Sequence, residues 1–318
     1  MRQRPSDQDR LYSEVMRLAG KVEGTRFGVA VSGGPDSMAL LNLMRLAFPG
    51  QVEAATVDHG LRPEAAEEAA MVGRWCVAQG IAHATLSPDR PITGNIQSSA
   101  RSARYALLDD WRQRRSIAWV LTAHHADDQA ETMLMRLNRG AGVSGLAGIR
   151  SKAGHVLRPL LAWRRAALLE HCRDAALPFV DDPSNHNPDF DRVAMRNCLQ
   201  KAGWIDPVAL ARSAAALQDA EEAIGHVIAQ LLEAHVVAAE EGWRMSAMAE
   251  LPREFQRRII LHLLSQDAQM GAPRGDSLDH AIARAHAGGQ ASLGRWLLQG
   301  GEQWSLRLAP PRRSPLGK

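Results

Sequence analysis

Residues 26–37, RFGVAVSGGPDS, join a short apolar run to a glycine-rich turn. The run 26–31 has the length of a buried strand, and a helix is predicted over 36–47. A loop between a strand and a helix directs unpaired backbone N–H groups and the positive helix end at one point. Two glycines let an anion approach that backbone closely. The stretch therefore predicts a phosphate-binding loop at Ser32, Gly33, Gly34, Pro35, Asp36 and Ser37.

Asp36 is the unusual residue of this loop, because a carboxylate repels phosphate. A Mg²⁺ ion between Asp36 and a pyrophosphate group removes the conflict, since Mg²⁺ takes oxygen ligands. The loop is neither a Walker loop, which needs Gly-Lys-Ser/Thr, nor Gly-x-Gly-x-x-Gly. The alternative is a plain strand-to-helix turn. We favour a nucleotide site with Asp36 as metal ligand.

Strand-like and helix-like segments alternate through the first half of the chain. Further strands are predicted over 51–57, 81–86 and 117–122, and further helices over 7–19, 63–79, 97–114 and from about residue 126. This alternation predicts an α/β fold, a doubly wound, Rossmann-like parallel sheet with its sites at the carboxyl ends of the strands.

The composition changes after about residue 205. Helices are predicted over 208–240 and 252–265, a hairpin over 290–298 and 302–308, and disorder in the tail 310–318. We therefore predict two domains, a catalytic domain over 1–207 and a mainly helical domain over 208–318.

Charge and composition restrict the class of protein. Lys and Arg number 38 against 35 Asp and Glu, and the pI is about 9.0. This is a weak indication of a polyanionic partner, although a GC-rich genome also enriches arginine. No apolar run approaches the ~18 residues of a membrane span, and no secretory signal is recognisable, so a cytoplasmic protein with no membrane partner is predicted. Cys76, Cys172 and Cys198 have no metal or disulfide spacing and are expected to be buried.

A cluster of histidines and acids follows the strand predicted at 117–122. It contains His124, Asp127, Asp128 and Glu131. On a helix the three carboxylates approach one another and repel, unless a cation lies among them. Three interpretations remain open: an acid-rich, solvated helix start, a metal site, and a pocket for a cationic amine in which a carboxylate or His124 accepts the proton.

Three other segments contain candidate residues. Asp58 or His59 follows the second strand and either contacts the nucleotide or caps a turn. Arg101 and Arg104 are three residues apart and either bind phosphates or form a solvated helix face. The four glycines of residues 139–149 exclude a stable helix, so a mobile flap or a plain flexible loop is expected there.

These strings together resemble the bacterial tRNA(Ile)-lysidine synthetases, in the PP-loop superfamily of N-type ATP pyrophosphatases. The matching strings are SGGPDS, VDHGLR, ARSARY, residues 122–149, RPLL at 158–161, DDPSN at 181–185 and the arginines of DRVAMR. The resemblance covers residues 24–207. The family usually has asparagine where this chain has Val193.

The resemblance implies a two-step reaction and a set of roles. ATP adenylates the C2 oxygen of the wobble cytidine in the isoleucine tRNA with a CAU anticodon, and the ε-amine of free lysine then displaces AMP. Residues 32–37 would bind ATP, and Asp36 would hold Mg²⁺. The resemblance assigns catalysis and lysine capture to His124, Asp127, Asp128 and Glu131, and nucleotide or RNA contacts to Asp58, Arg104, Arg192 and Arg196.

Two other functions were considered. A tRNA 2-thiocytidine synthetase has a similar loop, but such enzymes depend on paired cysteines, which this chain lacks. A non-catalytic RNA-binding module is the second alternative, and the intact loop and acid cluster argue against it.

Overall fold

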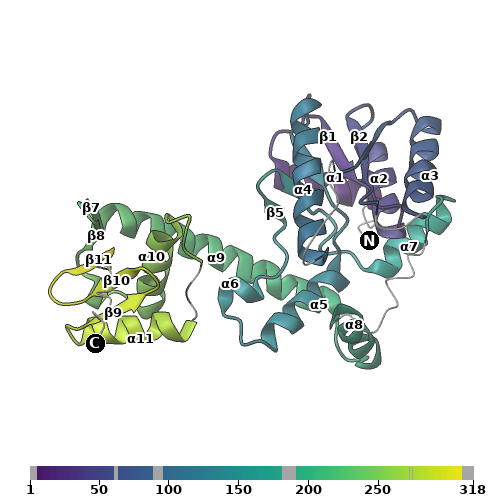
Figure 1. Cartoon of the computed structure of the whole chain (residues 1–318). Coiled ribbons are helices and arrows are strands. Elements are labelled where there is room, and N and C mark those ends of the chain that lie inside the picture. Colours follow the sequence, from purple (N-terminus) through teal and green to yellow (C-terminus); the bar gives the residue numbers. More distant parts are fainter. Residues whose placement is uncertain are drawn as a thin grey trace, which may run out of the picture. The chain divides into compact units, whose positions relative to one another are not determined.

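The structure is a computed structural model that describes residues 6–60, 64–88, 96–180, 191–271, 273 and 275–309. The chain forms two compact units, Met1–Asp219 and Ala220–Lys318 (Figure 1). The predicted boundary at 207/208 coincides with the start of α9 (Pro207–His235), which contributes residues to both units. None of the described helices is long and apolar enough to cross a membrane.

A six-stranded sheet forms the centre of the first unit, in the order β3-β2-β1-β4-β6-β5. Every neighbouring pair is parallel except β5 with β6. The strands are β1 (Phe27–Ala30), β2 (Val52–Val57), β3 (Ala82–Leu86), β4 (Trp119–Leu121), β5 (Lys152–Ala153) and β6 (Val156–Leu157). The strand order reverses between β1 and β4, which is where open α/β sheets bind ligands. The predicted doubly wound fold is confirmed.

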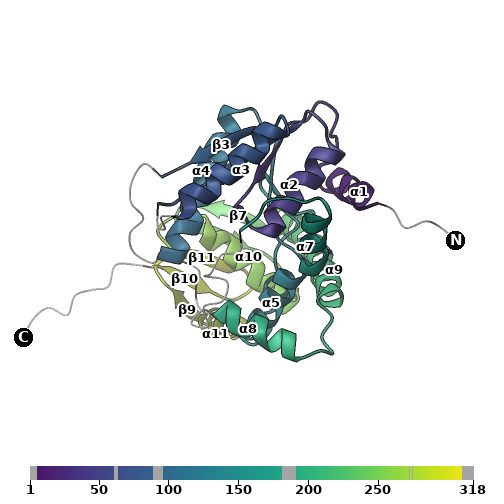
Figure 2. The same ribbon diagram turned by 90° about the vertical axis from the view of Figure 1, so that its right-hand side faces the viewer.

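Helices cover both faces of this sheet. The first-unit helices are α1 (Asp7–Ala19), α2 (Pro35–Ala47), α3 (Glu64–Ala78), α4 (Ile96–Arg114), α5 (Ala126–Leu137), α6 (Val143–Leu146), α7 (Arg165–Asp174) and α8 (Asp191–Lys201). One apolar core unites α1, α2, α3 and α7 against the sheet, and α4 packs on a second core. α7 lies beside α2, and α8 beside α5, in both views (Figures 1 and 2).

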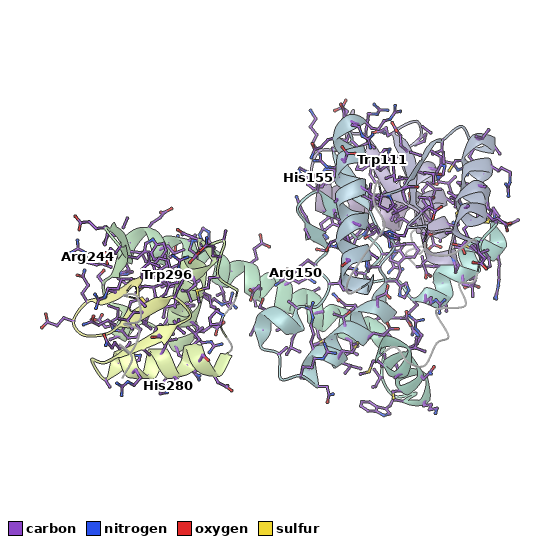
Figure 3. All side chains as sticks on the ribbon, viewed as in Figure 1. Trp111, Arg150, His155, Arg244, His280 and Trp296 are labelled. Atoms are coloured by element: carbon purple, nitrogen blue, oxygen red, sulfur yellow. The ribbon has the colours of Figure 1, made fainter. Side chains whose placement is uncertain are left out.

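The second unit contains a sheet that the sequence did not predict in full. It is antiparallel, in the order β7-β8-β11-β10-β9, and packs on α10, α11 and the end of α9. The elements are β7 (Val236–Ala239), β8 (Gly242–Met245), the 3₁₀ turn η2 (Met248–Glu250), α10 (Arg253–Ser265), α11 (Gly275–His286), β9 (Gln290–Leu293), β10 (Trp296–Gln299) and β11 (Trp304–Leu308). Trp296 lies in this sheet (Figure 3).

Two local expectations for the second half of the chain were inaccurate. The helix predicted over 208–240 ends at His235, where β7 begins. The predicted hairpin exists as β10 and β11, but residues 290–298 also contain β9 and a turn at Gly294. The tail 310–318 lies outside the described residues.

The glycine-rich segment 139–149 is held by side-chain hydrogen bonds. It contains α6, so the expectation that no helix forms there was wrong. Arg136 donates to the carbonyls of Gly145 and Gly148. Gln129 bonds both the amide and the carbonyl of Ile149. Gln218 of α9 donates to the Ala147 and Ile149 carbonyls and accepts from the Ser151 amide. The side chains of Arg136, Gln129 and Gln218 thus supply hydrogen bonds to this segment that its own glycines, which have no side chains, cannot make.

The three cysteines differ in how far they are buried. Cys76 and Cys172 are buried, and burial raises the pKa of their thiols to about 12 and about 11 respectively. Cys198 is exposed, so the expectation that it is buried was wrong. Its position on α8 follows the polar character of that helix.

The close contact between β1 and α4 depends on Gly28. Trp111 of α4 lies against the sheet (Figure 3), and a Cβ added at Gly28 would be 2.5 Å from its ring. We expect Gly28→Ala to lower the free energy of unfolding of the first unit by about 1–3 kcal/mol, the usual cost of overpacking. Urea denaturation followed by tryptophan fluorescence measures it.

Gly203→Ala is the matched control, because nothing lies within 4 Å of its added Cβ. This variant should unfold within about 0.5 kcal/mol of the wild type. Equal midpoints for Gly28→Ala and Gly203→Ala would contradict the close-contact argument.

Candidate active site

A cleft of about 440 Å³ opens at the carboxyl ends of β1 and β2 and beside the start of α5. Part of its lining is apolar and comes from Ala30, Val31, Ala55, Val57 and Val180. The remainder is polar and includes Ser32, Gly34, Asp36, Ser37, His59, Glu68, Arg104, His125, Asp128, Arg165 and Arg196. An apolar wall beside backbone amides and charged side chains suits a nucleotide, whose base is flat and whose phosphates are anionic.

The loop at 32–37 is held in shape by its own hydrogen bonds. Ser37 Oγ accepts from the Ser32 amide at 3.1 Å and donates to the Gly34 carbonyl at 2.9 Å. Gly33 has φ +82°, a left-handed conformation that favours glycine, and its carbonyl accepts from the Val180 amide at 2.9 Å. Pro35 begins α2 without needing an amide partner. The loop thus presents the helix start to the cleft, as predicted.

One carboxylate oxygen of Asp36 has no partner among the described residues. Oδ1 is buried and forms no hydrogen bond with the described part of the chain. Oδ2 lies 3.6 Å from His125 Nε2 and 3.7 Å from Arg165 Nε. A buried carboxylate oxygen without a donor is costly, and a hard cation would satisfy it. Asp36 therefore fits the role of a ligand to a Mg²⁺ ion that would itself bind phosphate oxygens.

His125 connects this loop to α5. Its Nδ1 accepts from the Asp128 amide at 3.3 Å while Asp128 Oδ2 accepts from the His125 amide at 3.1 Å, which forms a capping box. Burial lowers the pKa of His125, but the hydrogen bond of Asp36 and the charges of Asp128, Asp36 and Asp127 raise it by more. Because Nδ1 accepts, the proton of the neutral ring lies on Nε2, which faces Asp36.

Two of the three acids of α5 form ion pairs with arginines. Asp127 accepts from the Arg165 amide at 2.8 Å and pairs with Arg164 at 3.3 Å. Glu131 is almost completely buried and pairs with Arg196 at 2.8 Å. No group of three or more His, Cys, Asp or Glu side chains in the described part could hold a metal ion. Asp128 is the α5 carboxylate that lines the cleft.

The other predicted residues fall into separate groups. Asp58 Oδ1 accepts from the Gly60 amide at 2.8 Å, as a turn cap does, and His59 rather than Asp58 lines the cleft. His124 Nδ1 lies 2.9 Å from Thr122 Oγ1 and also lies outside the cleft lining. Arg104 and Arg196 line the cleft. The Arg192 side chain and the DDPSN segment lie outside the described residues.

The sequence analysis missed Arg165 and the cap made by His125. Arg165 begins α7, a helix that was not predicted because β6 before it has only two residues. The cap was recognisable, because His125 and Asp128 have the three-residue spacing of a capping box, although histidine replaces the usual serine or threonine.

Comparisons with known proteins agree with this geometry. Residues 8–202 match the PP-loop domain family, so fold and loop together define a PP-loop protein. Two relatives called tRNA(Ile)-lysidine synthase are similar over nearly their whole length. The one from Zymomonas mobilis is 40% identical over 316 residues, 96% of this chain and 95% of the relative. The one from Novosphingobium aromaticivorans is 42% identical over 303 residues, 91% and 90% of the two chains.

The chain therefore belongs to the tRNA(Ile)-lysidine synthase family, a family of PP-loop enzymes, as the resemblance implied. Among solved structures, the U34-tRNA thiolase of Methanococcus maripaludis with its 4Fe–4S cluster covers 66% of this chain and 79% of its own. Its TM-score is 0.55 at 16% identity, which shows a shared fold alone.

The contact between His125 and Asp36 predicts a change in a pKa. Asp36→Asn removes a negative charge and the carboxylate that accepts from Nε2, so the pKa of His125 should fall. NMR titration of protein with labelled histidine rings measures it. Asp58→Asn is the control, because Asp58 raises the pKa of His59 instead. An unchanged pKa of His125 in Asp36→Asn would show that the two groups do not interact.

Proposed function

We propose that this protein uses ATP to ligate free L-lysine to C2 of the wobble cytidine in the isoleucine tRNA with a CAU anticodon. The observation that carries the proposal is the shared cleft: the loop at 32–37 and Asp128 of the acid cluster face the same space. Membership of the tRNA(Ile)-lysidine synthase family supports the choice of RNA and product.

The first step would be adenylation of the cytidine. The C2 oxygen attacks the α-phosphorus of ATP, the bond to the bridging oxygen of the β-phosphate breaks, and pyrophosphate leaves. The amides at the start of α2 and the hydroxyls of Ser32 and Ser37 would bind the phosphates, and Arg104 and Arg196 would balance the developing charge. Mg²⁺ on Asp36, when bound, would neutralise the phosphate oxygens.

The second step would be attack by lysine. The ε-ammonium group first gives up one proton. The neutral amine then bonds to C2, AMP departs with the former C2 oxygen, and a phosphate oxygen of the departing AMP takes the second proton from the nitrogen. Asp128 lines the cleft and would bind the ammonium group and accept its proton. Asp127 and Glu131 would act through their arginine partners, Arg164 and Arg196, by fixing the charges around Asp128. His124, beside Thr122, would support the same strand end.

The roles of the remaining residues follow the same proposal. Asp58 would shape the turn that places His59 against the nucleotide. Arg192 stays a predicted RNA or nucleotide contact. We also propose that residues 208–318 bind the body of the tRNA. This segment contains 12 basic and 12 acidic residues, so its binding would depend on where its arginines lie and not on its net charge.

Analysis of modified nucleosides tests the proposal directly. The cognate tRNA is incubated with enzyme, ATP, Mg²⁺ and lysine, digested, and examined by mass spectrometry. We expect one cytidine to gain a lysine with loss of water, with AMP and pyrophosphate in equal amounts. Omission of lysine should abolish the product. A sulfur-containing cytidine, or no pyrophosphate, would refute the proposal.

Asp36→Asn tests the nucleotide site. Pyrophosphate release in the presence of tRNA should fall by about a hundredfold or more, the scale of losing one electrostatic group in an active site. A coupled pyrophosphate assay measures the rate. Asp110→Asn, at an exposed position of α4, is the control. Release at the wild-type rate by Asp36→Asn would remove this residue from the mechanism.

Asp128→Asn tests lysine capture. Asparagine keeps an oxygen for the His125 amide but has no charge for the ammonium group, so the KM for lysine should rise about tenfold or more. The single-turnover release of pyrophosphate without lysine should change much less. The same KM for lysine in variant and wild type would contradict a cationic-amine pocket at Asp128.

A further inference from the structure

Two arginines surround the Tyr105 side chain on α4, beside the cleft. The guanidinium of Arg101 lies 5.1 Å from the centre of the Tyr105 ring, with Nη2 3.5 Å from the hydroxyl. Arg158, which follows β6, has Nη2 3.4 Å from the same hydroxyl. Arg104 precedes Tyr105 and lines the cleft. Positions 101, 104 and 105 share one helix face, so this face connects the cleft to the exposed Arg101.

The charges on this face are all positive. Burial raises the pKa of Tyr105, whereas the hydrogen bond of Arg158 and the charges of Arg158, Arg101 and Arg104 lower it. Burial lowers the pKa of Arg104; Tyr105 raises it, and Arg101 lowers it further. Within the described part of the chain, none of these three arginines forms an ion pair with a carboxylate.

Other arginines of the same helix behave differently. Arg112 pairs with Asp109 at 2.7 Å, and Arg114 pairs with Asp110 at 2.6 Å. At the end of α4 away from the cleft, arginines thus pair with aspartates of the same helix. At the end beside the cleft, the described residues include no such pairs. Cations held together without an acid repel one another, and an anion bound between them would relieve that cost.

Arg158 adds a positive charge from beneath this face. Its side chain is buried, and Nη1 donates to the Arg150 carbonyl at 2.8 Å. Nε is buried without a hydrogen-bond partner in the described part of the structure. Such a group is costly to fold. Its position next to the Tyr105 hydroxyl makes that hydroxyl a better donor to an incoming anion.

We propose that Arg101 and Tyr105, backed by Arg158 and next to Arg104 of the cleft, bind a backbone phosphodiester of the substrate RNA within two nucleotides of the cytidine that enters the cleft. This inference rests on the proposed function. Arg104 lines the cleft, but Arg101, Tyr105 and Arg158 do not. The site therefore borders the cleft that the cytidine would enter, and Arg104 lines this cleft together with the loop at 32–37 that would hold the phosphates of ATP. Arginine and tyrosine are common donors to RNA and DNA phosphates.

Arg101→Gln tests the site, with Arg114→Gln as the matched control on the same helix. Dissociation constants for the full-length tRNA are measured without ATP or lysine over a series of salt concentrations. We expect Arg101→Gln to bind about tenfold more weakly, with a salt slope reduced by about one. Arg114→Gln should bind like the wild type. Tyr105→Phe, which keeps the ring, should weaken binding in the same direction.

A neutral linkage in the RNA identifies the phosphate. A methylphosphonate replaces each phosphate near the wobble cytidine in turn. At one position the replacement should weaken binding by the wild type while adding little to the loss in Arg101→Gln. Additive losses at every position would overturn the proposal. So would unchanged tRNA binding by Arg101→Gln together with a raised KM for ATP or weaker inhibition by pyrophosphate, because the site would then bind pyrophosphate.

These measurements separate the two proposals. Affinity for RNA is measured without any reaction, so it does not depend on lysidine formation. A wild-type protein that forms no lysidine, yet shows the expected losses in Arg101→Gln, would refute the proposed function and retain the phosphate site. If the wild type forms lysidine and the Arg101→Gln variant binds tRNA like the wild type, the phosphate site is refuted and the proposed function is retained.

Discussion

The contacts of His125 join the two segments that meet in the cleft. One ring nitrogen caps α5 and the other faces Asp36 of the loop at 32–37. The two segments are about 90 residues apart in the sequence, and they meet because β1 and β4 are neighbouring parallel strands. Protonation of Nδ1 would break the cap, so the charge of this ring and the start of α5 are linked. The side chain of His125 thus caps α5 and also contacts the loop at 32–37.

The acids in and around the cleft differ in whether they are paired with an arginine. Asp127 and Glu131 pair with Arg164 and Arg196. In the part of the chain that the structure describes, one oxygen of Asp36 has no partner, and Asp128 lines the cleft. In such a site Asp36 and Asp128 are the carboxylates that remain able to bind a cation or a cationic group of a ligand. The paired acids hold the arginines in place, and Arg196 lines the cleft in which phosphate charge would develop. Preorganised charge of this kind needs little rearrangement during a reaction.

The sequence predicted the parts of the fold in which local pattern and tertiary structure agree. The apolar run before Ser32 became β1, and the helix predicted over 7–19 became α1. The two-residue strands β5 and β6 are too short for any periodicity, so Arg158 and Arg165, which follow them, were not placed. The ion pairs of Asp127 and Glu131 could not be predicted either, because their partners lie 37 and 65 residues away in the chain.

Gln218 has a consequence for any minimal catalytic fragment. Its amide holds the Ala147 carbonyl and the Ser151 backbone N–H, and it is the second-last residue of the first unit. A fragment that ends at residue 207 would include every residue that lines the cleft. It would lack Gln218, however, and with it the hydrogen bonds to Ala147 and Ser151. An excised enzyme core should therefore keep α9 at least through Gln218, because the start of this helix completes the hydrogen bonds of the core.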